Sequence, residues 1–181
     1  MGIIGTLYAL NEKEVQKIKA IPRENDARAE YVWRFMDSFC DKSREWDLDQ
    51  GWEDMDDMVS DGIDEFPEIF PVDCAGLLFY GGEWLCDGPG AWGCGVDDES
   101  DDEQYEEDGD YGGMVILKSP ERVAKIASAL PKSECVYRGA WSVNHDMFDV
   151  DYVWGCFEGA REIYQKAAAE KLYVLFAAFA P

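Results

Sequence analysis

The chain lacks the motifs on which several common catalytic sites are built. Its 181 residues contain no glycine-rich loop ending in Lys-Ser or Lys-Thr, no Gly-x-Ser-x-Gly and no His-Glu-x-x-His. These absences argue against a phosphate-binding loop, a serine hydrolase with a nucleophile elbow and a zinc protease of that signature. The sequence therefore assigns no catalytic residue through a motif.

Histidine is almost absent. The single one, His145, stands in the stretch VNHDMFD. Together with Asp146 it could supply two members of a nucleophilic triad. Adjacent residues on a strand point to opposite faces, however, so neighbouring positions give weak support for a catalytic pair. We expect His145 to lie in a polar turn, and a catalytic role is the alternative.

Long hydrophobic runs are also missing. No stretch reaches 18 consecutive apolar residues, and no basic region followed by an apolar core marks a secretion signal. The opening MGIIGT does fit the myristoylation pattern, with Gly2 and Thr6 in place. A single acyl chain needs a second signal such as a basic patch, and this chain is strongly acidic. We therefore expect residues 3–10 to form a buried strand, and the protein to be cytoplasmic without a membrane partner.

Cysteine pairs at metal-binding spacing are absent as well. The six cysteines are dispersed and include no Cys-x-x-Cys pair. A zinc site built on Cys86 and Cys94 would need two further ligands. Reduced thiols, mostly buried, are the expected state, and the sequence predicts no cofactor and no metal.

Basic residues are missing from two long stretches, and this absence shapes the charge of the whole chain. Residues 45–68 hold eleven acidic residues and residues 97–110 hold ten, while neither stretch has a Lys or Arg. The rest of the chain carries 18 acids and 16 bases, so the net charge of −23 is concentrated in these stretches. Such a field repels nucleic acid and anionic membranes, and it attracts basic proteins and cations.

The same acids could bind a metal ion weakly. The cluster of Glu53, Asp54, Asp56 and Asp57 is close enough in sequence to share a cation. Residues 97–110 offer further oxygen ligands, but they lack the spacing of an EF-hand and its glutamate at the twelfth position. Weak calcium binding is compatible with this pattern, whereas a dedicated metal site is not predicted.

Helical periodicity and capping residues predict several helices. Asn11 begins a capping box, and Ser119 precedes a proline in the first turn. Asp47 or Asp49 is expected to cap a helix in which Trp52, Met55 and Val59 share the buried face, and Asp149 or Asp151 is expected to begin the last helix. The expected helices span about residues 11–20, 25–40, 47–60, 119–130 and 149–167.

Apolar runs predict strands at residues 3–10, 114–117 and 172–179, the last of them central in a sheet. Residues 76–114 are expected to be irregular, with an acidic loop at about 84–113. Helices and strands that follow one another without regular βαβ alternation indicate the α+β class. We therefore expect a single compact domain over residues 1–181, with several helices packed on a small mixed sheet.

Four segments, in order, resemble one bacterial family. They are MGIIG at the start, LDQGWEDM (48–55), YGGMVILKSPERVAKIASAL (111–130) and FEGAREIYQKAAAEKLYVLF (157–176). Together they resemble the YfbM-like family, a domain of unknown function. The resemblance implies a compact α+β bacterial cytosolic domain and supplies no activity. This chain departs from the family pattern at Gln50, where relatives carry Lys, and at Asp56, where a His is frequent.

Aromatic residues among the acids suggest a protein-binding surface. Trp84 and Trp92 stand near glycines and are the better candidates for exposure, whereas Trp52 is expected in the core. Aromatic anchors surrounded by charges suit the docking of a basic protein. The predicted partner-binding residues are Asp97, Asp98, Glu99, Asp101, Asp102, Glu103, Tyr105, Glu106, Glu107, Asp108, Asp110, Trp84 and Trp92.

The sequence therefore favours a non-enzymatic protein-binding module with a basic protein as its partner. A concrete version is an immunity-type inhibitor of a basic toxin such as a nuclease. One alternative is a carboxylate- or metal-dependent hydrolase that uses the Glu53–Asp57 cluster, and another is a DNA-mimic regulator. A simple solubility role for the charge is the least specific interpretation.

Overall fold

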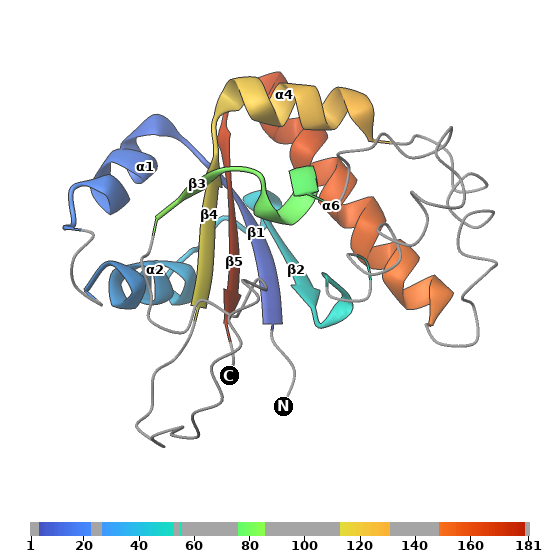
Figure 1. The fold of residues 1–181 in the computed structure, drawn as a ribbon, viewed down its shortest axis with the longest axis horizontal. Helices are drawn as coiled ribbons and strands as arrows, with labels where there is room; N and C mark the ends of the chain where they lie inside the picture. The colour runs from blue at the N-terminus through green and yellow to red at the C-terminus, as the bar shows by residue number, and fades with distance from the viewer. Residues whose placement is uncertain are drawn as a thin grey trace, which may run out of the picture.

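The computed structural model describes residues 4–22, 27–52, 55, 76–85, 113–130 and 149–179. In these parts of the chain, helices pack on both sides of one sheet (Figure 1). His145, the Glu53–Asp57 cluster, Trp92 and the acids of residues 97–110 lie outside the described residues. The structure does not test the predictions that concern these residues.

The sheet has five strands in the order β2-β1-β5-β4-β3. Every described pair of neighbours is antiparallel, so the expected mixed sheet is an antiparallel one within the confirmed α+β class. The reason is that β1 and β4 flank β5 and both run opposite to it. The strands are β1 (Ile4–Leu10), β2 (Glu45–Asp49), β3 (Glu83–Trp84), β4 (Gly113–Lys118) and β5 (Tyr173–Phe179).

β5 is the central strand, as its continuous apolar sequence YVLFAAF predicts. Val174 and Phe176 face one side of the sheet and are fully buried. Leu175 and Ala177 face the other side and are equally buried. A strand covered on both faces has no solvent side, and its sequence therefore shows no alternation of apolar and polar residues.

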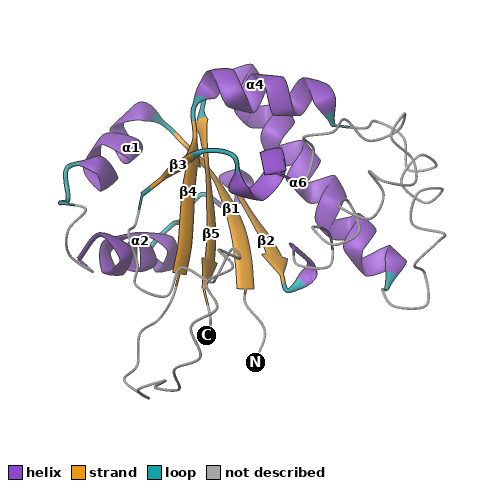
Figure 2. Ribbon diagram, in the orientation of Figure 1, coloured by secondary structure: helices purple, strands orange, loops and turns teal. Residues whose placement is uncertain are grey.

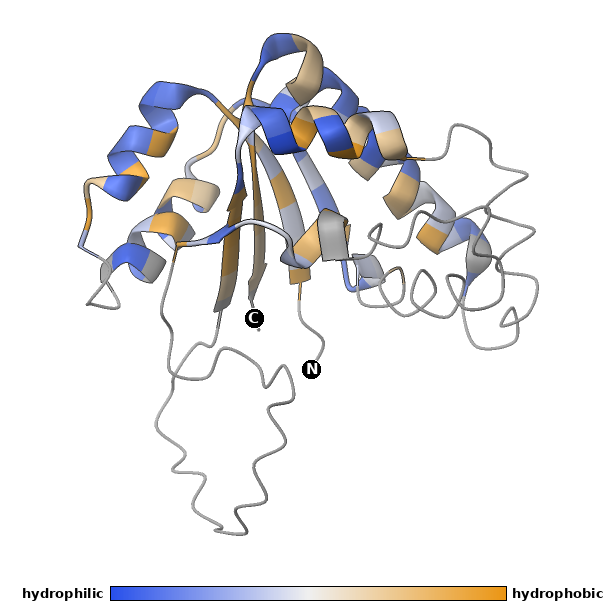
Figure 3. Ribbon diagram, turned by 45° about the horizontal axis from the view of Figure 1, so that its top comes forward, coloured by the Kyte–Doolittle hydropathy of each residue, from blue (hydrophilic) through white to orange (hydrophobic). Residues whose placement is uncertain are grey.

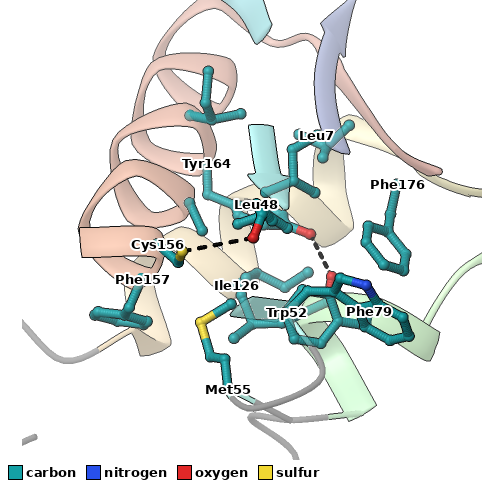
Figure 4. Close-up of a cluster of buried hydrophobic side chains, with 14 of the residues drawn as sticks. Leu7, Leu48, Trp52, Met55, Phe79, Ile126, Cys156, Phe157, Tyr164 and Phe176 are labelled. Atoms are coloured by element: carbon teal, nitrogen blue, oxygen red, sulfur yellow. Dashed lines mark hydrogen bonds between the residues drawn. The ribbon is translucent and has the colours of Figure 1, made fainter. Parts of the chain in front are cut away.

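Two layers of helices provide this cover (Figure 2). α1 (Glu12–Lys19) and α2 (Ala27–Asp37) lie on one side of the sheet, and α4 (Pro120–Ala129) and α6 (Val150–Glu170) on the other. In Figure 3, β4 and β5 are hydrophobic between helices that carry many hydrophilic residues. The larger core lies under α4 and α6, where Trp52, Phe79 and Phe176 form edge-to-face or tilted ring pairs (Figure 4).

The predicted helix starts are confirmed by their caps. The side chain of Asn11 accepts from the backbone N–H of Glu14 at 3.1 Å, and the Glu14 carboxylate accepts from the backbone N–H of Asn11 at 2.7 Å. Ser119 caps α4 ahead of Pro120, and Asp149 rather than Asp151 caps α6. These local signals are strong because each satisfies backbone donors that the helix leaves unpaired.

The predicted helix capped by Asp47 or Asp49 is wrong at its start. Residues 45–49 form β2, in which Trp46 and Leu48 turn toward α6 while the acidic residues alternate with them. This period of two, paired with β1, overrides the local capping signal. Helical structure begins only at Gly51, and Trp52 and Met55 are buried as predicted.

The expected irregular segment is also shorter than predicted. Residues 76–85 contain the π-helical turn η2 (Gly76–Tyr80) and β3, and Gly113 already belongs to β4. Leu78, Phe79 and Leu85 are fully buried. The sequence does not predict these elements, because a single helical turn and a two-residue strand are too short to show a periodic pattern of apolar residues.

Arg28, near the start of α2, forms hydrogen bonds to the end of α1 and to the residue after β3. Its guanidinium donates to the carbonyl oxygens of Ile21 and Lys19, and through Nη1 to that of Leu85 at 3.0 Å. The residue is only 6% exposed. A buried guanidinium with several carbonyl acceptors holds the α1–α2 connection against the end of β3.

None of the described helices combines the length and the apolar character that a bilayer crossing requires. Residues 4–10 form β1, in agreement with the strand expected at this position.

Candidate functional site

Both acid-rich stretches join the sheet at the same end. Register places Asp49 opposite Gly5, and it places Phe179 opposite both Ile4 and Gly113. This end, with the last residue of β2 and the first of β4, is called the Asp49 end of the sheet; the N and C labels lie below it in Figure 1. The stretch at 45–68 continues beyond Asp49, and the stretch at 97–110 precedes Gly113.

The connection that contains residues 97–110 also leaves β3 toward this end. The backbone N–H of Leu85 donates to the carbonyl of Val115 at 3.0 Å, which continues the β3–β4 pairing in the direction of Gly113. Residues 86–112 therefore begin beside Val115, with the chain heading toward the Asp49 end, and they end at Gly113.

The described part of the protein is nearly neutral. It contains 15 acidic and 13 basic residues, a net charge of −2, whereas the whole chain carries −23. The charge excess thus belongs to residues outside the described elements. Because electrostatic repulsion within the sheet and helices is small, the fold and the acidic charge are separable properties.

Trp84 is the one predicted partner-binding residue that the structure describes. It is half-buried in β3, lies opposite Ile116 of β4 and packs against the larger core. Trp84 is therefore only partly exposed, because pairing of β3 with β4 turns the indole onto the core, and its role in binding stays a prediction. Trp92 and the acids of residues 97–110 lie outside the described residues, and their role stays a prediction.

Two exposed aromatic side chains outside the predicted set of partner-binding residues lie between β2 and α6; one of them, Trp46, is among the aromatic residues with acidic neighbours that the sequence suggests for docking. Trp46 is 37% exposed and Tyr152 is 40% exposed. The Trp46 Nε1–H donates to the carbonyl of Cys156 at 3.2 Å, and the Tyr152 hydroxyl donates to Asp49 Oδ2 at 3.2 Å. With Asp49, they form a surface that we call the β2–α6 seam: Trp46, Asp49 and Tyr152. Asp47 is exposed on the opposite face of β2, on the side of Tyr8.

Each of the two rings of the seam packs against a glycine. A Cβ at Gly159 would lie 1.8 Å from the Trp46 indole, and one at Gly51 would lie 3.0 Å from the Tyr152 ring. The rings therefore rest directly on backbone. Since these contacts join residues about a hundred positions apart, no local sequence signal could have shown them.

Asp49 ends β2 in a left-handed conformation. Its φ is 48°, a region that Asp and Asn enter more readily than most residues. Its backbone N–H donates to Asp47 Oδ1 at 2.8 Å, which stabilises the turn. Burial, the nearby Cys156 and Asp49 raise the pKa of Tyr152 to about 12, so its hydroxyl remains a donor at neutral pH.

Gly159→Ala should displace Trp46 and destabilise the protein, because the new methyl group occupies the space of the indole. We expect a loss of about 1–3 kcal/mol in the free energy of unfolding, measured by urea denaturation. Gly155→Ala is the matched control in the same helix, since its Cβ meets nothing within 4 Å. It should be neutral or stabilising by about 0.5–1 kcal/mol, and equal losses in the two variants would contradict the seating of Trp46.

A buried lysine lies at the opposite end of β4. Lys118 is 0% exposed, and its ammonium donates to the carbonyl of Phe79 at 3.2 Å and lies 5.9 Å from the ring centroid of Phe176. Tyr164 donates to the adjacent carbonyl of Leu78 at 2.8 Å. Two buried donors thus hold consecutive carbonyls of η2 in the core.

Burial, with a smaller contribution from Arg122, lowers the pKa of Lys118 to about 7. In an unfolded chain the lysine pKa is about 10.4. Between these values the unfolded chain binds more protons, so the folded state gains stability as the pH rises. The sequence interpretation missed this residue, because a lysine between a strand and a helix cap is ordinarily at the surface.

Lys118→Met should flatten this pH dependence. The wild type is expected to gain a few kcal/mol of unfolding free energy between about pH 7 and pH 9.5, and the variant to lose that part of the slope. Urea denaturation of both proteins across this range measures the difference. Identical slopes would show that Lys118 keeps its ordinary pKa in the folded protein.

The described residues contain no group of three or more His, Cys, Asp or Glu arranged to hold a metal ion. Neither described cysteine forms a disulfide: the exposed Cys40 donates through Sγ to the carbonyl of Ser38, and the buried Cys156 to that of Leu48.

Comparison of the chain with protein-family models, with curated proteins and with solved structures finds no match. The resemblance to the YfbM-like family therefore stays a prediction carried by the four sequence segments.

Proposed function

We propose that the protein binds a basic protein partner without catalysing a reaction. The observation that supports this function is the attachment of both acid-rich stretches at the Asp49 end of a nearly neutral scaffold. In this proposal the like charges of two segments that leave the scaffold at one end act together as a directional field. An immunity-type inhibitor of a basic toxin, for example a nuclease, is the concrete form of this proposal.

In this mechanism the charge acts mainly on the association rate. Residues 97–110 attract the basic face of the partner and occupy the groove that would otherwise hold phosphate groups. Electrostatic steering of this kind raises association rates by about 10–1,000-fold, and salt reduces the effect. Aromatic contacts supply the affinity that screening by salt does not remove.

The family resemblance and the acidic composition fit a bacterial cytoplasmic protein, and this location is part of the proposal. A cytoplasmic inhibitor would meet a toxin before the toxin reaches nucleic acid.

The proposal is tested by capture of partners from the native cell lysate at low and high salt. The bait is the intact chain, compared with a variant in which the ten acids of residues 97–110 become Asn or Gln at unchanged length. We expect the intact chain to retain a basic protein at low salt, and the neutralised variant to lose about tenfold or more of it.

A scrambled 97–110 stretch with unchanged composition is the control for charge alone, and it should keep most of the captured partner. Circular dichroism should show the same fold in all baits. Retention of the same protein by the neutralised variant would contradict the role of residues 97–110. Failure of the intact chain to retain any basic protein would contradict the proposed function itself.

A further inference from the structure

We propose that the β2–α6 seam is the docking site for an extended basic segment of the partner, which adds as a strand to the outer edge of β2. This inference rests on the proposed function, because it names the contact that the basic partner makes. It is carried by three features of the described residues: an edge strand, two fixed aromatic rings and two carboxylates that form no ion pair within the described part of the chain.

The first feature is the position of β2 in the sheet. On one side it pairs with β1, and no other described strand pairs with its second side. Trp46, Asp47 and Asp49 are exposed along its five residues. An edge strand presents backbone donors and acceptors in a row, and it is a template for an added strand from another protein.

The second feature is the fixed pair of rings. Of the four large apolar side chains that are exposed among the described residues, two belong to the seam. Trp46 is held by its hydrogen bond to Cys156 and Tyr152 by its hydrogen bond to Asp49. Rings that are immobilised before binding lose little conformational entropy, and their faces attract guanidinium groups.

The third feature is charge. Glu45 is paired with Lys42, whereas the carboxylates of Asp47 and Asp49 have no ion-pair partner among the described residues. Asp49 lies beside Tyr152 on the α6 side, whereas Asp47 points to the other face of β2. An added strand has side chains on both faces, so each carboxylate can meet a basic residue of it, and the rings favour Arg, which donates in a plane and stacks on them.

The same charges discourage pairing with a second copy of this chain. Two β2 strands would bring Asp47 and Asp49 of both copies together, and like charges across strands are destabilising. A basic segment is therefore the occupant that this edge fits.

The test uses a short peptide of alternating Arg and Thr as the probe. Heteronuclear NMR of the intact chain locates its binding site residue by residue. We expect shifts at the amides of residues 45–49, at the Trp46 indole N–H and at the Tyr152 amide. A control peptide with alternate backbone nitrogens methylated keeps its charge but cannot pair along one edge, so it should leave the β2 amides unshifted.

The matched variants are Asp47→Asn with Asp49→Asn, and separately Trp33→Ala. Asn tolerates the left-handed backbone at position 49, so the double variant removes charge while the fold is kept. It should weaken binding of the peptide about fivefold or more at low salt. Trp33 is exposed in α2, on the other side of the sheet, and its substitution should not change peptide affinity.

The outcomes separate this inference from the proposed function. Peptide shifts confined to residues 97–110, with silent β2 amides, would overturn the seam as the docking site. Capture of a basic lysate protein that the Asp47→Asn/Asp49→Asn variant retains fully would also overturn it, while the proposed function stands. Peptide binding at the seam without any basic partner in the lysate would uphold the site and overturn the function.

Discussion

The burial of β5 on both faces is the constraint on which the rest of the structure depends. Each fully buried Leu or Phe side chain contributes about 1.5–3 kcal/mol through removal from water. To obtain this gain, the chain must place β1 and β4 beside β5 and cover both faces of the sheet with helices. The pairing of Phe179 with Ile4 and Gly113 then follows, and with it the common end at which both acidic stretches attach.

Buried polar groups complete this core rather than weaken it. Lys118 and Tyr164 donate to consecutive carbonyls of η2, and Arg28 donates to the carbonyls of Lys19 and Ile21 in one segment and of Leu85 in another. These donors position the turn and the short β3 from which residues 86–112 continue. The link from the core to the acidic connection is therefore made by a few named hydrogen bonds in the described residues, together with the packing of Phe79 and Leu85.

The sequence predicted what local chemistry decides. Asn11, Ser119 and Asp149 cap helices because a nearby backbone N–H meets their side chain, and the apolar run of β5 reflects burial on two sides. The sequence prediction failed where contacts between residues far apart in the chain decide the structure. The helix expected over residues 47–60 begins too early, because residues 45–49 pair with β1, some forty residues earlier, and form β2. In the seam, the packing of Trp46 against Gly159 and the hydrogen bond from Tyr152 to Asp49 leave no local pattern in the sequence. The role of the acids at residues 97–110 stays a prediction.

The central claim is that a nearly neutral scaffold folds independently of the acidic stretch that it carries. Amide hydrogen exchange of the intact chain and of a variant lacking Asp97–Asp110 tests this most directly. The account predicts the same protection in β1, β4, β5 and α6 of both proteins, since β5 pairs with β1 and β4, and α6 packs on β1 and β2, through described residues. Loss of protection in β4 and β5 of the variant would show that the stretch is part of the fold, and would contradict the account.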